Sequence, residues 1–194
     1  MVTPRPAASL LVLRADPPQV LMGLRGAGHR FMPNRLVFPG GAVDPEDHGA
    51  ATAAPLRADV FVRLCRHAPA ELATAIAVAA ARELEEETGL TLGTPPALDG
   101  LDYLCRAVTP DTSPIRFDAR FLVVDATRVT GTLAGSGELE DLRWYGLQEV
   151  EALDLAFATR SVLARLQQWR AMTPAERAAR PEVPVLFNRN WTTE

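Results

Sequence analysis

Three glutamates on one face of a predicted helix are the residues of this chain best suited to chemistry. Glu83, Glu86 and Glu87 stand at i, i+3 and i+4, the spacing of neighbouring side chains on a helix, and Gly89 follows as a helix stop. Like charges at this spacing repel, so the cluster gains from a cation among the carboxylates. Hard oxygen ligands suit Mg²⁺ or Mn²⁺. The alternative is a solvated acidic helix end.

A glycine pair upstream favours the metal site over the acidic helix end. Gly40 and Gly41 follow a short apolar run and precede an acidic loop, and glycine is used where the backbone turns sharply or approaches a ligand closely. In this order, residues 38–47 and 82–90 resemble the Nudix box. Its core reads Arg-Glu-apolar-x-Glu-Glu-x-Gly-apolar, and residues 82–90 match every fixed position.

The box is interrupted in this chain. The family pattern places an acid six positions after the second glycine, and Asp47 stands there in place of the usual Glu. Seven residues normally separate this acid from the arginine, whereas residues 48–81 make 34 here, so about 27 are inserted. A split box, together with residues 29–37, resembles the peroxisomal coenzyme A diphosphatases and their bacterial relatives. We expect the insertion to line or cover one side of the substrate cleft.

The resemblance implies a set of metal-binding and catalytic residues. Nudix glutamates hold Mg²⁺ or Mn²⁺, which gives Glu83, Glu86 and Glu87 as catalytic metal ligands, with Gly41 as a further ligand. An additional acid often precedes the last strand of the fold. Glu138 is the first candidate for this catalytic acid, and Glu140 is the second.

Arginines near the box are candidates for structural and substrate contacts. Arg82 is always cationic and cannot be a ligand, so we expect it to pair with Asp47 and fix the loop against the helix. Arg25, Arg116 and Arg120 are candidates for binding substrate phosphate, because a guanidinium offers planar donors. The three histidines are scattered and are interpreted as surface or loop residues without a metal role.

Composition indicates an ordinary globular protein. The chain has 194 residues, 47% of them hydrophobic and 23% charged, and its net charge of −4 does not favour nucleic-acid or membrane binding. Cys65 and Cys105 are too few for a disulfide framework and are interpreted as small core residues. No apolar stretch is long enough for a membrane span, and the N-terminus is a poor secretory signal, so we expect a cytoplasmic protein.

The pattern of elements predicts one α/β (α+β) domain over residues 1–194, with the Nudix fold of a mixed β-sheet sandwiched between helices. Expected strands cover residues 9–13, 20–24, 36–38, 101–108, 116–124 and 142–145. Expected helices cover 56–67, inside the insertion, then 69–88 and 161–169. Residues 174–194, rich in Pro and Arg, are expected to form a partly ordered C-terminal tail.

The resemblance implies a pyrophosphohydrolase that cuts the diphosphate linkage of a nucleoside diphosphate derivative, with coenzyme A or a related compound as a candidate. Two alternatives use the same fold. Isopentenyl diphosphate isomerase chemistry needs a Cys and an acid in particular places, and neither cysteine fits. A catalytically silent nucleotide-binding or sensor module would be expected to have lost box glutamates, all three of which are present. A homodimer is the commonest symmetric assembly.

Overall fold

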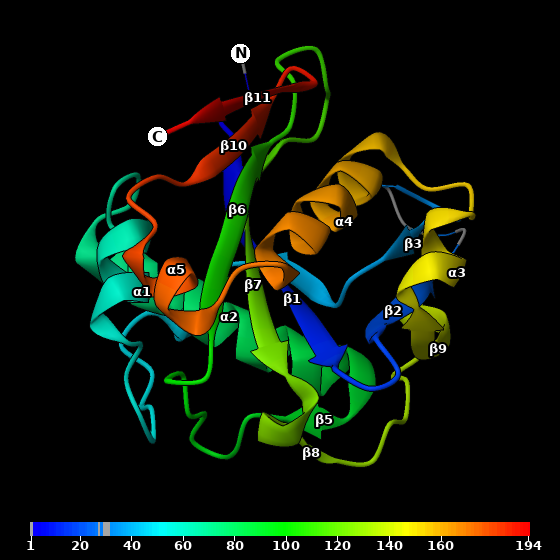
Figure 1. The fold of residues 1–194 in the computed structure, drawn as a ribbon, viewed down its shortest axis with the longest axis horizontal. Coiled ribbons are helices and arrows are strands. Elements are labelled where there is room, and N and C mark those ends of the chain that lie inside the picture. Colours follow the sequence, from blue (N-terminus) through cyan, green and yellow to red (C-terminus); the bar gives the residue numbers. More distant parts are fainter. Residues whose placement is uncertain (1, 27, 29–31) are drawn as a thin grey trace.

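A nine-stranded mixed sheet between two helical layers forms the fold (Figure 1). The computed structural model describes residues 2–26, 28 and 32–194, so the predicted loop position of His29 lies outside the described residues. The strands of the sheet are β1 (Arg5–Arg14), β2 (Gln19–Arg25), β3 (Leu36–Val37), β4 (Gly40–Ala42), β6 (Asp102–Val108), β7 (Phe117–Asp125), β9 (Leu139–Gly146), β10 (Pro184–Phe187) and β11 (Asn190–Thr193). Two short strands, β5 (Leu90–Thr91) and β8 (Thr130–Gly131), pair separately.

The helices cover both faces of this sheet. They are α1 (Ala58–Leu64), α2 (Ala70–Thr88), α3 (Leu147–Glu151), α4 (Phe157–Arg170) and α5 (Pro174–Ala179), with short 3-10 turns at Pro45–Asp47 and Ala126–Arg128. The mixed α+β architecture and the sheet between helices confirm the predicted fold class. None of the helices in the described part of the chain is long and apolar enough to cross a membrane.

Strand β1 lies at the centre of the sheet and brings the glycine pair to it. It runs parallel to β7 and antiparallel to β2 and β4. In the β1–β4 pair, Ser9 lies opposite Gly40 and Ala8 opposite Gly41. The Gly-Gly turn is therefore fixed by the sheet itself.

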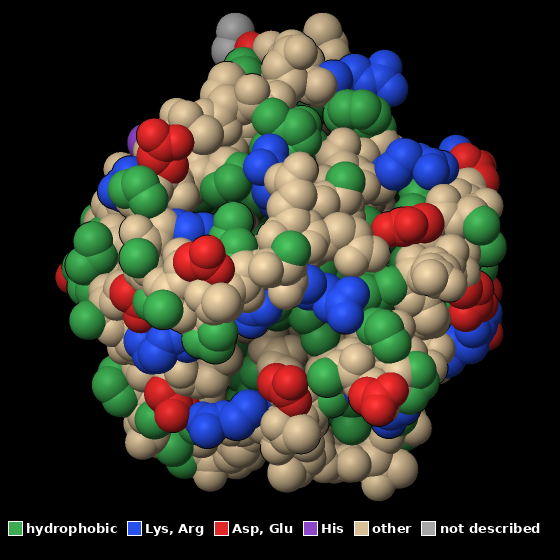
Figure 2. Space-filling model, in the orientation of Figure 1, with side chains coloured by type: hydrophobic (Ala, Val, Ile, Leu, Met, Phe, Trp, Pro, Cys, Tyr) green, Lys and Arg blue, Asp and Glu red, His purple; other side chains and the backbone are tan. Residues whose placement is uncertain are grey.

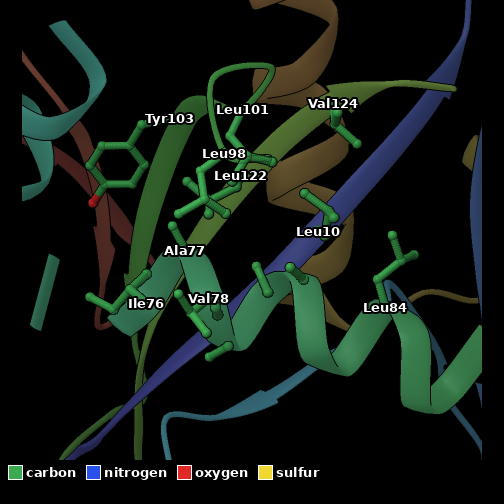
Figure 3. Close-up of a cluster of buried hydrophobic side chains, with 14 of the residues drawn as sticks. Leu10, Ile76, Ala77, Val78, Leu84, Leu98, Leu101, Tyr103, Leu122 and Val124 are labelled. Atoms are coloured by element: carbon green, nitrogen blue, oxygen red, sulfur yellow. The ribbon is translucent and has the colours of Figure 1, made fainter. Parts of the chain in front are cut away.

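One face of the sheet packs against α2. Successive side chains of a strand point to opposite faces, and Leu10 and Val12 of β1 point to the α2 side. Figure 3 shows Leu10 close to α2, where Ile76 and Ala77 are completely buried. Small alanine side chains let this helix approach the sheet closely, and α2 ends at Gly89 in the left-handed conformation, φ 71°.

The opposite face packs against α4. Leu11 and Leu13 of β1 join the predicted apolar stripe of that helix, which is buried against the sheet and consists of Val162, Leu163, Leu166 and Trp169. Cys105 is buried in the same core, as expected, and Cys65 is partly buried. The two layers hold α2 and the start of α4 on opposite sides of the β1–β4 pair (Figure 1).

The expectation of a partly ordered C-terminal tail is wrong. Residues 174–194 form α5, β10 and β11, and β10 joins the main sheet in parallel with β6. Val183, Val185 and Leu186 are buried. Two buried apolar residues in a strand of four give a weak pattern, and the partner that completes it, β6, is distant in the sequence.

Candidate active site

The last turns of α2 carry the three glutamates to the Gly-Gly turn. Gly40 N–H donates a hydrogen bond of 2.8 Å to Glu87 Oε2, and Glu87 is only 3% exposed. Gly41 lies directly against the carboxylate of Glu83, where any side chain on Gly41 would collide with it. Glu86 is more open, with 57% of its side chain exposed. Helix and turn thus meet through a backbone donor and a close approach that only glycine permits.

Arg82 ties the loop of the box to the same helix. Its Nε and Nη2 donate to the two oxygens of Asp47 at 2.9 and 3.0 Å, so the predicted contact is present in bidentate form. Nη2 also donates to the carbonyl of Ala42 at 3.0 Å. Nη1 lies 2.9 Å from Glu83 Oε1 and 3.0 Å from Glu86 Oε2. One guanidinium therefore joins β4, the 3-10 turn at Asp47 and α2.

Burial and crowding of negative charge change the ionisation of this cluster. Burial raises the pKa of Glu87 to about 7, against the lowering effect of the Gly40 hydrogen bond. Burial likewise raises the pKa of Glu83, although Arg82 lowers it. The charge of Glu138 makes a small further contribution to the rise at both residues. A cation at this point would favour the ionised carboxylates.

The oxygen atoms in this cluster are of the type that binds a divalent cation. Carboxylate oxygens of Glu83, Glu86 and Glu87 are the hard ligands that Mg²⁺ and Mn²⁺ prefer, and the backbone of Gly41 lies against the Glu83 carboxylate. Within the part of the chain that the structure describes, no three acidic, histidine or cysteine side chains are already gathered around one ion position. Arg82 Nη1 instead donates hydrogen bonds to carboxylate oxygens of Glu83 and Glu86.

A cavity of about 250 Å³ opens on the other side of the glycine pair. Gly40, Gly41 and Arg25 line it, and Arg25 Nε is buried without a hydrogen-bond partner among the described residues. Its Nη2 donates a long hydrogen bond of 3.5 Å to the carbonyl of Gly40. An orphaned guanidinium N–H beside the carboxylate cluster suits an anionic ligand.

The structure contradicts the predicted substrate contacts of Arg116 and Arg120. Both side chains are almost fully buried, at 5% and 1% exposed, and neither lines the cavity. Arg116 bonds to backbone carbonyls and pairs with Asp111 at 2.6 Å. Arg120 bonds to the carbonyl of His67 at 3.0 Å and pairs with Asp118. Both arginines hold the protein's own segments together.

None of residues 48–81 lines this cavity, so the cavity gives no support to the expectation that the insertion lines or covers the substrate cleft. Helix α1 packs through Val60 and Leu64 into the core on the α2 side. The chain before it is held by hydrogen bonds of 2.9 Å, from Ala53 N to the carbonyl of Pro96 and from Leu98 N to the carbonyl of Ala54.

Sequence reasoning missed the residues that close the cavity at its outer side. Phe157 at the start of α4 and Arg189 in the β10–β11 turn line it, together with Leu186. Their positions carry no motif, and two of them fall in the segment expected to be a tail. Glu140, the second candidate for the catalytic acid, is exposed on β9 opposite Leu24.

Comparisons with known proteins agree with the fold and the box. Residues 71–166 match the NUDIX domain family. Putative nudix hydrolase 7 of Caenorhabditis elegans is 36% identical over 86 residues, which are 44% of this chain. The match spans only 22% of the length of that curated relative.

Solved structures give the same result. A NUDIX hydrolase from Alicyclobacillus acidocaldarius has a TM-score of 0.65 and 27% identity, over 84% of this chain and 91% of its own. A MutT NUDIX hydrolase from Burkholderia pseudomallei has a TM-score of 0.57 and 21% identity, over 85% and 99%, and shows the fold alone. The interrupted box and the sheet that fixes its glycines agree with the match of residues 71–166 to the NUDIX domain family.

Proposed function

We propose that this protein is a divalent-metal-dependent pyrophosphohydrolase that cuts the diphosphate linkage of a nucleoside diphosphate derivative. Glu83, Glu86, Glu87 and the carbonyl of Gly41 are the proposed ligands of Mg²⁺ or Mn²⁺. The observation that carries the proposal is the position of the glycine pair, which contacts the glutamates on one side and lines the cavity on the other. A diphosphate in this cavity would lie beside the carboxylate cluster.

The protein's own groups have distinct proposed roles. Arg25 binds phosphate oxygens through donors that are free in the cavity, and Arg82 with Asp47 holds the loop against α2. The bound ion would neutralise charge on the diphosphate and activate a water. Glu138 is the proposed acceptor of the water proton, because it is exposed and its charge reaches Glu83 and Glu87. Hydrolysis breaks one bridging P–O bond and leaves two phosphate products.

Coenzyme A or a related compound is a candidate substrate because the box is split. The insertion does not line the cavity, so we expect the split itself to have little effect on specificity. A homodimer and a cytoplasmic location also remain predictions. The second candidate function is a silent nucleotide-binding module, and the bonds from Arg82 to Glu83 and Glu86 favour it to the extent that they block ion binding.

Incubation with diphosphate compounds and Mg²⁺ or Mn²⁺ tests the proposal. ADP-ribose, NADH and coenzyme A should be compared by chromatography of their monophosphate products, with EDTA as the metal-free control. We expect cleavage of at least one compound, its loss in EDTA and its loss in Glu87→Gln. Glu85→Gln, an exposed change in the same turn, is the matched control that should retain turnover. Tight binding without cleavage would identify a silent module instead.

A further inference from the structure

Two arginines that form no direct ion pair with a described residue line the cavity beside the glycine pair, and the charge of one of them, Arg25, acts on Glu87. One is Arg25 at its inner end, and the other is Arg189 at its outer side. No Asp or Glu is among the described residues that line the cavity. Several arginines elsewhere on the sheet are paired with carboxylates, such as Arg106 with Asp118 at 2.7 Å. Arg189, with no carboxylate along the cavity, therefore suits an anionic ligand there.

Arg189 is held in place by an aromatic ring. It lies in the β10–β11 turn with φ 65°, and its guanidinium carbon is 4.7 Å from the ring centroid of Phe157. Phe157 is 42% exposed at the first position of α4, an unusual place for a large apolar side chain. No hydrogen bond or ion pair involves the Arg189 side chain within the described residues. Stacking thus orients the guanidinium while its N–H donors remain free.

The two cations lie far apart along the sheet. Arg25 ends β2, and Arg189 follows β10 in the order β10-β6-β7-β1-β2. Four strand spacings of about 4.8 Å separate these strands by roughly 19 Å. Figure 2 shows hydrophobic and basic side chains side by side where the tip of the β10–β11 hairpin faces the start of α4. One anionic group could not contact both arginines.

The wall between the two cations is largely apolar. Val108, Phe121 and Leu186 line this part of the cavity, and the edge of the Phe38 ring packs against Phe121 with centroids 6.2 Å apart. Such a surface suits a flat ring or an apolar chain. The ligand that matches the whole cavity has an anion at each end and an apolar or planar part between them.

We propose that Phe157 and Arg189 form a specificity site for a second anionic group, a phosphate monoester, at the end of the substrate remote from the diphosphate. This inference rests on the proposed function, because it takes the diphosphate to lie beside Arg25 and the glycine pair. Phe157 contacts the ring or chain of the ligand, and Arg189 donates to the monoester oxygens. An Arg–phosphate contact at an exposed rim should change affinity by about tenfold.

Matched ligand pairs test the inference. Coenzyme A and 3′-dephospho-coenzyme A differ by one phosphate monoester, as do NADPH and NADH. Dissociation constants should be measured by calorimetry in EDTA, where hydrolysis does not interfere, and kcat/KM in Mg²⁺. We expect the wild-type protein to bind the phosphorylated member of at least one pair about tenfold more tightly. Arg189→Gln should reduce this ratio to about one.

Arg165→Gln is the matched control, because Arg165 also stacks on an aromatic ring, Trp191 at 4.4 Å, but does not line the cavity. It should keep the wild-type preference. Equal affinity of both members in both pairs, or a preference that survives in Arg189→Gln, would overturn the inference. Cleavage without preference refutes this site alone, whereas preference without cleavage of any diphosphate refutes the proposed function alone.

Discussion

Replacing Glu87 by Gln should stabilise the metal-free protein at high pH while abolishing turnover. Glu87 is 3% exposed, and burial raises its pKa from 4.5 to about 7. The folded state therefore retains a proton on Glu87 that the unfolded chain loses at lower pH. A group with a raised folded-state pKa contributes its stability below the unfolded pKa and loses it as pH rises through the folded pKa. The window for Glu87 thus runs from about pH 4.5 to about pH 7.

The magnitude follows from the size of the shift. The difference of 7 − 4.5 is about 2.5 pKa units, and each unit corresponds to 1.36 kcal/mol, so the upper bound is about 3 kcal/mol. Gln is neutral at every pH, and its amide oxygen can still accept the Gly40 hydrogen bond. The free energy of unfolding of the variant minus that of wild type should therefore rise by up to about 3 kcal/mol between pH 4 and pH 8.

Urea unfolding in EDTA at pH 4, 6 and 8 measures this difference. Glu85→Gln, in the same helix turn but exposed, is the control that should show a much smaller change. Saturating Mg²⁺ should reverse the order of stability, because only the wild-type carboxylate can act as a ligand. A stability difference that is the same at all three pH values would refute the assignment of Glu87 as a buried, protonated acid.

Three further predictions concern the box and its insertion. Arg82→Ala should lower the free energy of unfolding by about 3 kcal/mol in urea titrations, because it leaves the buried Asp47 unpaired. Arg66→Ala should lower it far less, and equal losses in the two variants would contradict the pairing of Arg82 with Asp47. Gly41→Ala should reduce kcat at least about a hundredfold by displacing the adjacent glutamate carboxylate, whereas Gly146→Ala, with room for a methyl group, should be neutral in the same assay. Shortening residues 49–55 should lower the melting temperature, because hydrogen bonds hold this segment, but should change the KM values of different diphosphates equally. Unequal changes in KM would show that the insertion affects specificity.

The local parts of the site could be predicted from the sequence. Helix spacing brings Glu83, Glu86 and Glu87 to one end of α2, and the split box anticipates the contact of Arg82 with Asp47. These features depend on residues close in sequence or on a pattern that resembles a known box. The predicted metal ligation by the glutamates is consistent with this geometry and remains to be measured.

The predictions that were wrong concern residues whose contacts come from distant segments of the chain. Whether an arginine on a strand faces a cavity or the protein's own backbone is decided by register, and Arg120 on β7 faces the carbonyl of His67. A short strand such as β10 is recognisable only with its neighbour β6, since four residues carry too little periodicity. For the same reason the pairing of Arg189 with Phe157 has no signature in the sequence.

The glycine pair forms one end of the cavity, but its outer wall comes from segments that the box does not contain. The glutamates, the glycine pair and the arginine clamp all lie between residues 40 and 87, whereas the outer wall comes from α4 and the β10–β11 hairpin. The match to the NUDIX domain family ends at residue 166 and leaves this hairpin out. Substitutions in the hairpin can therefore alter which compounds are accepted while the bond-breaking machinery stays constant. Relatives grouped by their shared box alone would be expected to differ in their substrates.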